Sequence, residues 1–337
     1  MTVRDELAVG LWDPGDESVV PQIMEGLVAV GVPERFGIGW FYWKFRDGPW
    51  GPAVVAYARD RSDGRIAGVT AFGMWRLLHD GAPVLAGISF ATFVHPEFQK
   101  RGLFTELTRL AQEEALRRGA RVLFNFPNQS SRHGFLRLGW QDMHGIETWV
   151  KPVRLVRVLS RVVTGPRSLK AVVADPPDAA IHGAVPPFDD FSSLIEARTS
   201  WAGLWAGERT PSMLRWRFFG HPRYRYLHVE GDGVTALVRT ASRGSLREAQ
   251  IMDVFFPPER PAAAIRRLFR TIAERCEADT LAVMVTRGHP LRPILKTSGF
   301  LPVPNRVNFF TYPLVKDCPP VGDQVNWALS FSEIHMM

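Results

Sequence analysis

The hydrophobic and polar positions between residues 95 and 140 predict a strand end, a helix, a second strand and a short helix. Apolar residues at positions 103, 107, 110, 111 and 115 recur at the spacing of one helical face. Arg117 and Arg118 follow them, at the end of a helix where its dipole favours cations. We therefore predict a helix that begins directly after Gly102, a buried strand over residues 121–126 and a short helix that ends near Trp140.

The segment before the first of these helices is a basic turn that contains a glycine. Lys100 and Arg101 precede Gly102, whose lack of a side chain lets the backbone approach an anion closely. A helix N-terminus presents unpaired N–H groups and a partial positive charge, which suit a phosphate or pyrophosphate. The residues by themselves predict a phosphate cradle, and a plain helix start remains the alternative.

Two motifs at a fixed separation resemble those of the GNAT superfamily of acyl-CoA N-acyltransferases. Gln99 and Gly102 match the family's turn, in which Phe104 stands at a position where glycine or alanine is usual. The second family signature, an asparagine followed after a gap by glycine and an aromatic residue, is matched by Asn128, Gly139 and Trp140. The resemblance implies a mixed α/β fold of the α+β type.

The resemblance also implies acetyl-CoA or another acyl-CoA as the cofactor. In the family, the strand before the turn, here residues 89–94, splays from its neighbour, and its free amides hold the pantetheine. The amides of residues 100–105 would then hold the pyrophosphate. The expected cofactor-binding residues are Phe93, Val94, Gln99, Lys100, Arg101, Gly102, Leu103, Phe104, Thr105 and Asn128.

Acyl transfer to an amine requires a polarised thioester, a neutral amine and a neutralised thiolate. The family's usual acid is a tyrosine seven residues after the asparagine, a position that Phe135 occupies here. Ser131 is the preferred substitute, ahead of Ser130, His133 or water, although it also reads as an ordinary first-turn residue. For the general base we consider His95, Asp253 and Glu147. The predicted catalytic residues are Ser131 as the acid and His95 and Asp253 as candidate bases. No metal is expected.

An aromatic run at residues 40–43 predicts an acceptor pocket. Four consecutive aromatic residues cannot all face one core in a helix or a strand, so some of them would be exposed or line a cleft. We predict Trp40, Trp43 and Trp75 as substrate-binding residues, with packing between domains as the equal alternative.

The length of 337 residues exceeds what one such domain needs, and the second half echoes the first. Residues 216–222 resemble residues 43–49, and each half ends in a similar Leu-to-aromatic segment. Prolines at 257, 258 and 261 and Glu259 replace the basic turn, so the second copy should not bind CoA. We predict two GNAT-like domains in tandem: a catalytic domain over 1–150, a linker over 151–186 and a degenerate domain over 187–337.

Composition limits the partners. The net charge is +7, the hydrophobic share is 46%, and Cys276 and Cys318 show no metal-ligand spacing. No apolar run reaches the length of a bilayer and no cationic leader precedes one, so we expect a cytoplasmic protein without a membrane partner. The basic amphipathic stretch over 151–159 could touch a membrane or a nucleic acid, but a solvated or packed face is the favoured interpretation.

Three function hypotheses follow. The first is an N-acyltransferase, in particular an N-acetyltransferase, that acts on the primary amine of a small molecule such as an amino sugar or a natural-product amine. The second is an aminoacyl-tRNA-dependent transferase of the related tandem class, which the charge of +7 favours and the lack of a dense basic run disfavours. The third is a non-catalytic acyl-CoA-binding protein, suggested by Phe135.

Overall fold

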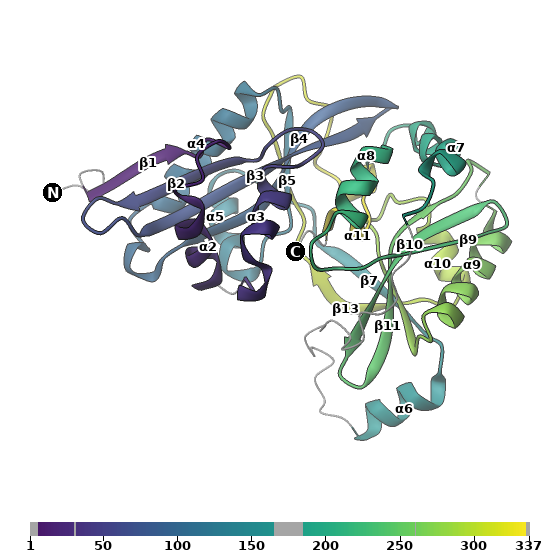
Figure 1. The fold of residues 1–337 in the computed structure, drawn as a ribbon. Coiled ribbons are helices and arrows are strands. Elements are labelled where there is room, and N and C mark those ends of the chain that lie inside the picture. Colours follow the sequence, from purple (N-terminus) through teal and green to yellow (C-terminus); the bar gives the residue numbers. More distant parts are fainter. Residues whose placement is uncertain (1–5, 30–31, 165–184, 260, 335–337) are drawn as a thin grey trace.

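A computed structural model describes residues 6–29, 32–164, 185–259 and 261–334, and shows two β-sheets with helices packed on them (Figure 1). The first sheet runs in the order β1 (Leu7–Leu11), β2 (Val54–Asp60), β3 (Ile66–His79), β4 (Ala82–Val94), β5 (Val122–Asn125), β14 (Phe310–Pro313) and β6 (Gln141–Asp142). β8 (Trp205–Gly207) pairs with β3 and with β15 (Trp327–Ala328). The mixed α/β prediction is confirmed.

The second sheet has the order β13 (Leu301–Val307), β7 (Ile146–Pro152), β12 (Thr280–Met284), β11 (Leu246–Phe255), β10 (Val234–Arg243) and β9 (Leu227–Gly231). The helices are α2 (Val20–Ala29), α3 (Gly37–Phe45), α4 (Leu103–Arg117), α5 (Gln129–Arg137), α6 (Leu155–Thr164), α7 (Ser192–Glu196), α8 (Pro211–Leu214), α9 (Ala262–Arg275), α10 (Arg292–Thr297) and α11 (Phe331–Ile334). None of the described helices has the length and apolar character needed to cross a bilayer.

Helix α4 begins at the predicted position because Gly102, at φ 84°, ends the preceding turn. Its apolar stripe packs on β2 and β3 and forms, with Phe135 and Trp140, the core on one face of the first sheet. At its other end, Arg117 and Arg118 both bond Glu114, and these hydrogen bonds lower the pKa of that carboxyl to about 2. The opposite face of the sheet carries α2, α3 and residues from the second half of the chain.

The two sheets exchange strands. β7 comes directly after β6 of the first sheet in sequence but pairs with β12 and β13 of the second sheet. β14 comes directly after β13 of the second sheet in sequence but pairs with β5 and β6 of the first sheet. The predicted boundaries at residues 150 and 187 therefore do not separate the sheets: the first boundary falls within β7, and β8, β14 and β15 belong to the first sheet. Contiguous ranges cannot describe an exchange that only long-range strand pairing creates.

Candidate functional site

The turn before α4 presents a row of backbone amides. Lys100 and Gly102 have φ values of 62° and 84°, a left-handed geometry that turns successive N–H groups toward one side. Within the part of the chain that the structure describes, the amides of residues 100–104 donate no hydrogen bond. Thr105 differs from the prediction, because its amide donates to the carbonyl of Gly102 at 3.0 Å and so belongs to the first helical turn.

Two side chains of the turn hold it in place. Gln99 Nε2 donates to the carbonyl of Val94 at 3.1 Å, which ties the turn back to β4. Arg101 pairs with Glu6 at 3.2 Å and lies over the ring of Phe98. Lys100 is exposed. The predicted basic turn therefore offers its amides and Lys100 to a ligand, while Gln99 and Arg101 fix its shape.

A gap between β4 and β5 leads toward this turn. The two strands pair in parallel only over residues 86–88 and 122–124, and β4 then continues to Val94 while β5 ends at Asn125. A bulge at Phe90 shifts the register of β4 against β3 at the point where the strands part. The predicted splay of residues 89–94 therefore matches the strand geometry.

The alternation of β4 decides which of its backbone groups face the gap. The amide of His95 donates to Ala67 of β3 at 2.8 Å. In an antiparallel pair, Phe93 then also directs its backbone to β3, and Thr92 and Val94 direct theirs away from it. The prediction is thus kept for Val94 and corrected for Phe93, whose side chain packs in the core against α2.

Two buried side-chain atoms on the strands that border the gap have no partner among the described residues. They are Thr92 Oγ1 on β4 and Asn125 Nδ2 on β5. A buried polar atom without a hydrogen bond costs about 1–3 kcal/mol, so such atoms suit a polar ligand that would satisfy them. The sequence analysis missed both, although Asn125 stands out as an amide in an otherwise apolar strand.

Residues 32–140 match the sequence model of the acetyltransferase (GNAT) family. This part of the chain carries a GNAT acetyltransferase domain. No curated protein sequence matches the chain.

Solved structures resemble the chain over both halves. A GCN5-related N-acetyltransferase from Kribbella flavida is 13% identical at a TM-score of 0.61, over 93% of this chain and 72% of that one. Saccharomyces cerevisiae N-myristoyltransferase with bound myristoyl-CoA is 11% identical at a TM-score of 0.57, over 93% of this chain and 84% of that one. A GCN5-related N-acetyltransferase from Anabaena variabilis is 10% identical at a TM-score of 0.61, over 91% of this chain and 73% of that one. At these identities the likeness shows the fold.

Phe104 does not cover the amides of the GNAT turn. Its ring packs on α5, at 5.2 Å from the ring of Phe135 in an edge-on contact. A Cβ on Gly134 would lie only 2.6 Å from this ring, so Gly134 makes the space that Phe104 fills. The bulky Phe104 in the turn is therefore accommodated because the neighbouring helix α5 has a glycine, Gly134, at the contact.

Asn128 and Ser131 form the cap of α5. The side-chain oxygen of Asn128 accepts hydrogen bonds from the amide and hydroxyl of Ser131, at 2.9 and 3.0 Å. An asparagine at this position stabilises the helix start. Ser131 thus occupies the ordinary first-turn role that was its alternative interpretation.

The two predicted bases lie far apart in the chain and in different settings. His95 follows the last residue of β4, and its Nδ1 lies 3.6 Å from Glu97. Because a strand rises about 3.3 Å per residue, His95 lies roughly 16 Å from the bulge at Phe90, beside the turn. Glu147, the third residue considered, pairs with Arg292 at 2.9 Å.

Asp253 is unsuited to accept a proton from an amine. Its carboxylate is fully buried and bonds Arg198, Arg209 at 2.7 Å and the hydroxyl of Ser332 at 3.1 Å. Burial raises the pKa of Asp253, but the two arginines outweigh it and bring the pKa to about 2. The carboxylate is a structural partner of the arginines, which no local sequence pattern announces.

The predicted acceptor tryptophans are core residues of the GNAT domain. Trp40, Trp43 and Trp75 are 2%, 6% and 0% exposed. Trp43 stacks on Trp216 with centroids 5.2 Å apart, and Trp75 packs against Trp50 and Trp216. α3 can bury most of its aromatic run because the second half of the chain covers the side that the first sheet does not. The alternative of packing between halves fits these contacts.

Lys44, in the same aromatic run, is a functional candidate that the sequence analysis missed. It is 4% exposed, and its Nζ donates to the carbonyl of Phe90 at 3.4 Å. Burial, followed by repulsion from Arg217, lowers the pKa of Lys44 to about 7. A lone cation between aromatic residues on a helix was the available signal.

The corresponding gap of the second sheet contains the chain's own C-terminal segment. β11 and β12 pair in parallel over 248–251 and 280–283, as β4 and β5 do in the GNAT domain. Beyond that pairing, Ser330 bridges to Val285, and the hydroxyl of Ser332 donates to the carbonyl of Met252 at 3.2 Å. Residues 329–332 thus lie between the ends of these two strands.

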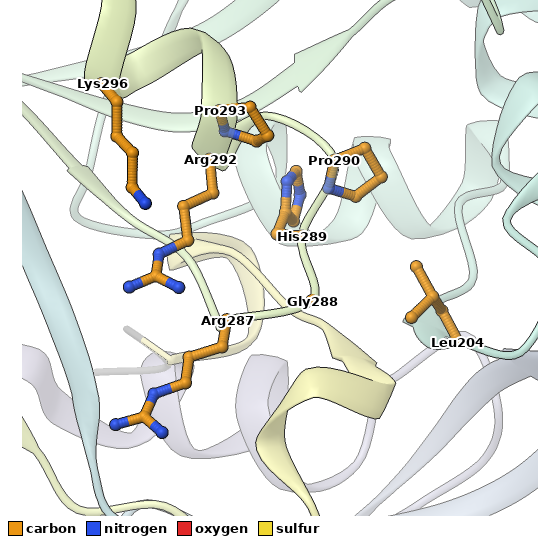
Figure 2. A pocket seen from close by; sticks show the side chains of 8 residues that line it. All are labelled: Leu204, Arg287, Gly288, His289, Pro290, Arg292, Pro293 and Lys296. Atoms are coloured by element: carbon orange, nitrogen blue, oxygen red, sulfur yellow. The ribbon is translucent and has the colours of Figure 1, made fainter.

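A separate basic pocket of about 270 Å³ lies in the second half (Figure 2). It is lined by Leu204, Arg287, Gly288, His289, Pro290, Arg292, Pro293 and Lys296. Arg292 is paired with Glu147, whereas Arg287 and Lys296 form no ion pair with any described residue. The pocket shares no residue with the turn or the gap of the GNAT domain.

Proposed function

We propose that the chain is an acyl-CoA-dependent N-acyltransferase whose cofactor lies along the turn and the gap of the GNAT domain. The observation that carries the proposal is the row of amides at residues 100–104, which donate no hydrogen bond within the described chain. A pyrophosphate accepts from such N–H groups at a helix N-terminus, and Lys100 adds a positive charge. The acyl-CoA supplies the activated acyl group as a thioester.

The residues of the gap support the same arrangement. Thr92 Oγ1, Asn125 Nδ2 and the outward amide of Val94 offer hydrogen-bonding groups that an amide-rich pantetheine chain needs, while the Val94 carbonyl accepts from Gln99. Thr92 and Val94 lie between the turn and the bulge at Phe90, and Asn125 lies at the level of the bulge, so the acyl end of the cofactor would reach the bulge. Phe90 and its neighbours then exclude water from the reacting thioester.

We infer that the second half is a degenerate GNAT-like domain with a structural role. Its parallel strand pair resembles that of the first half, but its gap holds residues 329–332 and its helix α9 follows Pro261. A tandem arrangement would make the second half cover the aromatic face of the first, as Trp216 does. The acceptor that we propose is the primary amine of a small molecule, which would approach between the two halves.

The proposal is tested with the purified chain and a series of acyl-CoA thioesters from acetyl to myristoyl. Native mass spectrometry reports co-purified CoA species, calorimetry measures affinity, and release of free CoA measures transfer to a panel of amino sugars and simple amines. Binding of one thioester with amine-dependent release of CoA is the expected result. Binding without turnover favours a non-catalytic acyl-CoA-binding protein, and failure to bind any thioester refutes the proposal.

A further inference from the structure

Lys44 is a buried cation without an acidic partner. Its Nζ lies 4.9 Å from the ring of Trp40 and 5.2 Å from the ring of Phe90. The carbonyl of Phe90, at 3.4 Å, is its one hydrogen-bond acceptor within the described chain, and no described carboxylate pairs with it. An ammonium group has three donors, so this environment satisfies it poorly. The neutral amine is the form that such a site favours.

A second polar group beside Lys44 also lacks a partner. The indole Nε1 of Trp40 is buried and donates to no described residue. Two buried polar groups on one helix, one of them against Phe90 in the bulge of β4 and the other beside it, point to a polar ligand at this place. The bulge is where β4 and β5 separate in the GNAT domain.

The second half of the chain shows what a cation at this position can contact. Lys44 follows Trp43 as Arg217 follows Trp216, and these residues occupy matching positions in the internal repeat. Arg217 Nε donates at 3.1 Å to the carbonyl of Ser332, which lies in the gap of the second sheet. By this correspondence, Lys44 is directed at whatever occupies the gap of the first sheet.

We propose that Lys44 is the general base that takes a proton from the acceptor amine, an assignment that rests on the proposed N-acyltransferase function. The acceptor arrives as an ammonium ion and transfers one proton to the neutral Nζ of Lys44. The freed nitrogen lone pair forms the bond to the thioester carbon, and the C–S bond breaks. The thiolate takes the proton that the new amide nitrogen loses, and Lys44 returns its proton to solvent. The products are the amide, free CoA and one proton.

The surroundings keep the amine of Lys44 available at neutral pH. The groups that face it are aromatic on α3 and β4, and the charged group across from it is Arg217, which bonds Ser332 and the hydroxyl of Tyr226. Burial and this like charge bring the pKa of Lys44 to about 7, where a base accepts a proton and releases it readily. The same positive charge of Arg217 disfavours an ammonium acceptor and so assists its deprotonation.

The first test observes Lys44 directly. The chain has six lysines, so ¹³C labelling of the lysine side chains gives a simple spectrum in which Lys44→Arg identifies the signal. We expect this signal to titrate near neutral pH and to shift on addition of acetyl-CoA, while that of the exposed Lys316 does not. A Lys44 signal that acetyl-CoA leaves unchanged, in a chain that binds acetyl-CoA, overturns the assignment.

The second test uses two acceptors that differ in their need for a base. Benzylamine is protonated at pH 7 and hydroxylamine is neutral. Because a general base contributes about 10²–10⁴-fold, Lys44→Met and Lys44→Arg should slow acetyl transfer to benzylamine by about 100-fold or more and leave transfer to hydroxylamine within about threefold. Lys316→Met is the matched control and should change neither rate.

The outcomes separate this inference from the function on which it rests. Equal losses with both acceptors, or no loss with either, in a variant that still binds acetyl-CoA would overturn the role of Lys44 alone. A wild-type chain that neither binds acetyl-CoA nor acylates either probe would refute the proposed function itself, and the role of Lys44 would fall with it.

Discussion

Trp43 and Trp216 hydrogen-bond each other's backbone in a reciprocal pair. The indole nitrogen of Trp43 donates to the carbonyl of Trp216 at 2.9 Å, and that of Trp216 donates to the carbonyl of Trp43 at 2.8 Å. The stacked rings are 173 residues apart in sequence, and they begin the two similar sequence segments at residues 43–49 and 216–222. A contact in which each partner makes the same bonds to the other is the signature of a local two-fold arrangement. The pair joins the two halves at the site of Lys44.

Replacing Trp43 with alanine should weaken this junction severely. The buried ring leaves a cavity and the carbonyl of Trp216 loses its donor, so we expect a loss of about 3–5 kcal/mol in the free energy of unfolding. Urea denaturation measures it. Tyr42→Ala, on the same helix but only half-buried, is the control and should cost less. Equal costs for the two variants would show that the reciprocal pair adds no specific stability.

Valine at position 102 should weaken acetyl-CoA binding. Gly102 has a φ of 84° and no atom within 4 Å of a Cβ, so the substitution acts through backbone strain that displaces the amides. Since one charged hydrogen bond is worth about 1.5–3 kcal/mol, the Kd should rise by about tenfold or more in calorimetry.

The matched control for Gly102 lies at the other end of the same helix. Gly119 has a φ of 93° and only one distant neighbour, so Gly119→Val introduces similar strain far from the turn. It should reduce the melting temperature as Gly102→Val does and leave the Kd unchanged. A similar Kd for both glycine variants and the wild type would argue against a role of the turn in binding.

The stability of the chain should depend on the protonation of Lys44. Its pKa falls from 10.5 to about 7 on folding, so between these values the unfolded chain holds a proton that the folded chain lacks. Burying the protonated Lys44 lowers the free energy of unfolding, and this cost is fully present below pH 7. As pH rises from 7 toward 10 the cost is relieved, so the folded state becomes more stable. At about 1.4 kcal/mol per pKa unit, the cost is on the order of a few kcal/mol.

Lys44→Met removes the titrating group and keeps the shape of the side chain. We expect the variant to melt at a higher temperature than the wild type at pH 6, with a difference that shrinks steadily toward pH 10. Melting curves across this pH range measure the difference in melting temperature. All other titrating groups are the same in the two proteins, so their effect cancels in this difference. A constant difference between the two proteins would mean that Lys44 does not titrate on folding.

Tyrosine at position 135 should not restore an acid. Phe135 is fully buried, with Phe104 at 5.2 Å and Trp140 at 5.0 Å from its ring. A hydroxyl added there would be buried among apolar side chains and would cost about 1–3 kcal/mol. We expect Phe135→Tyr to melt at a lower temperature without a faster release of CoA. A rise in the transfer rate at unchanged acetyl-CoA affinity would instead place this position at the leaving thiolate.

The sequence by itself determined the local secondary structure and helix capping of the GNAT domain. The start of α4 after Gly102, the asparagine cap of α5 and the short buried strand before it each depend on residues within a few positions of one another. Helical spacing, positive φ and capping are local properties, so a pattern in the chain is sufficient to predict them. The order of strands and helices over residues 95–140 could be predicted for the same reason.

Only the tertiary structure decided which of the buried ionisable side chains have their charge compensated. Asp253 is held by Arg198 and Arg209, which lie 55 and 44 residues before it, and its charge is already compensated. Lys44 meets the carbonyl of Phe90 across 46 residues and receives no such compensation. Burial and charge pairing arise from elements that are distant in sequence, as does the exchange of β7 and β14 between the sheets, so a local pattern carries no information about them.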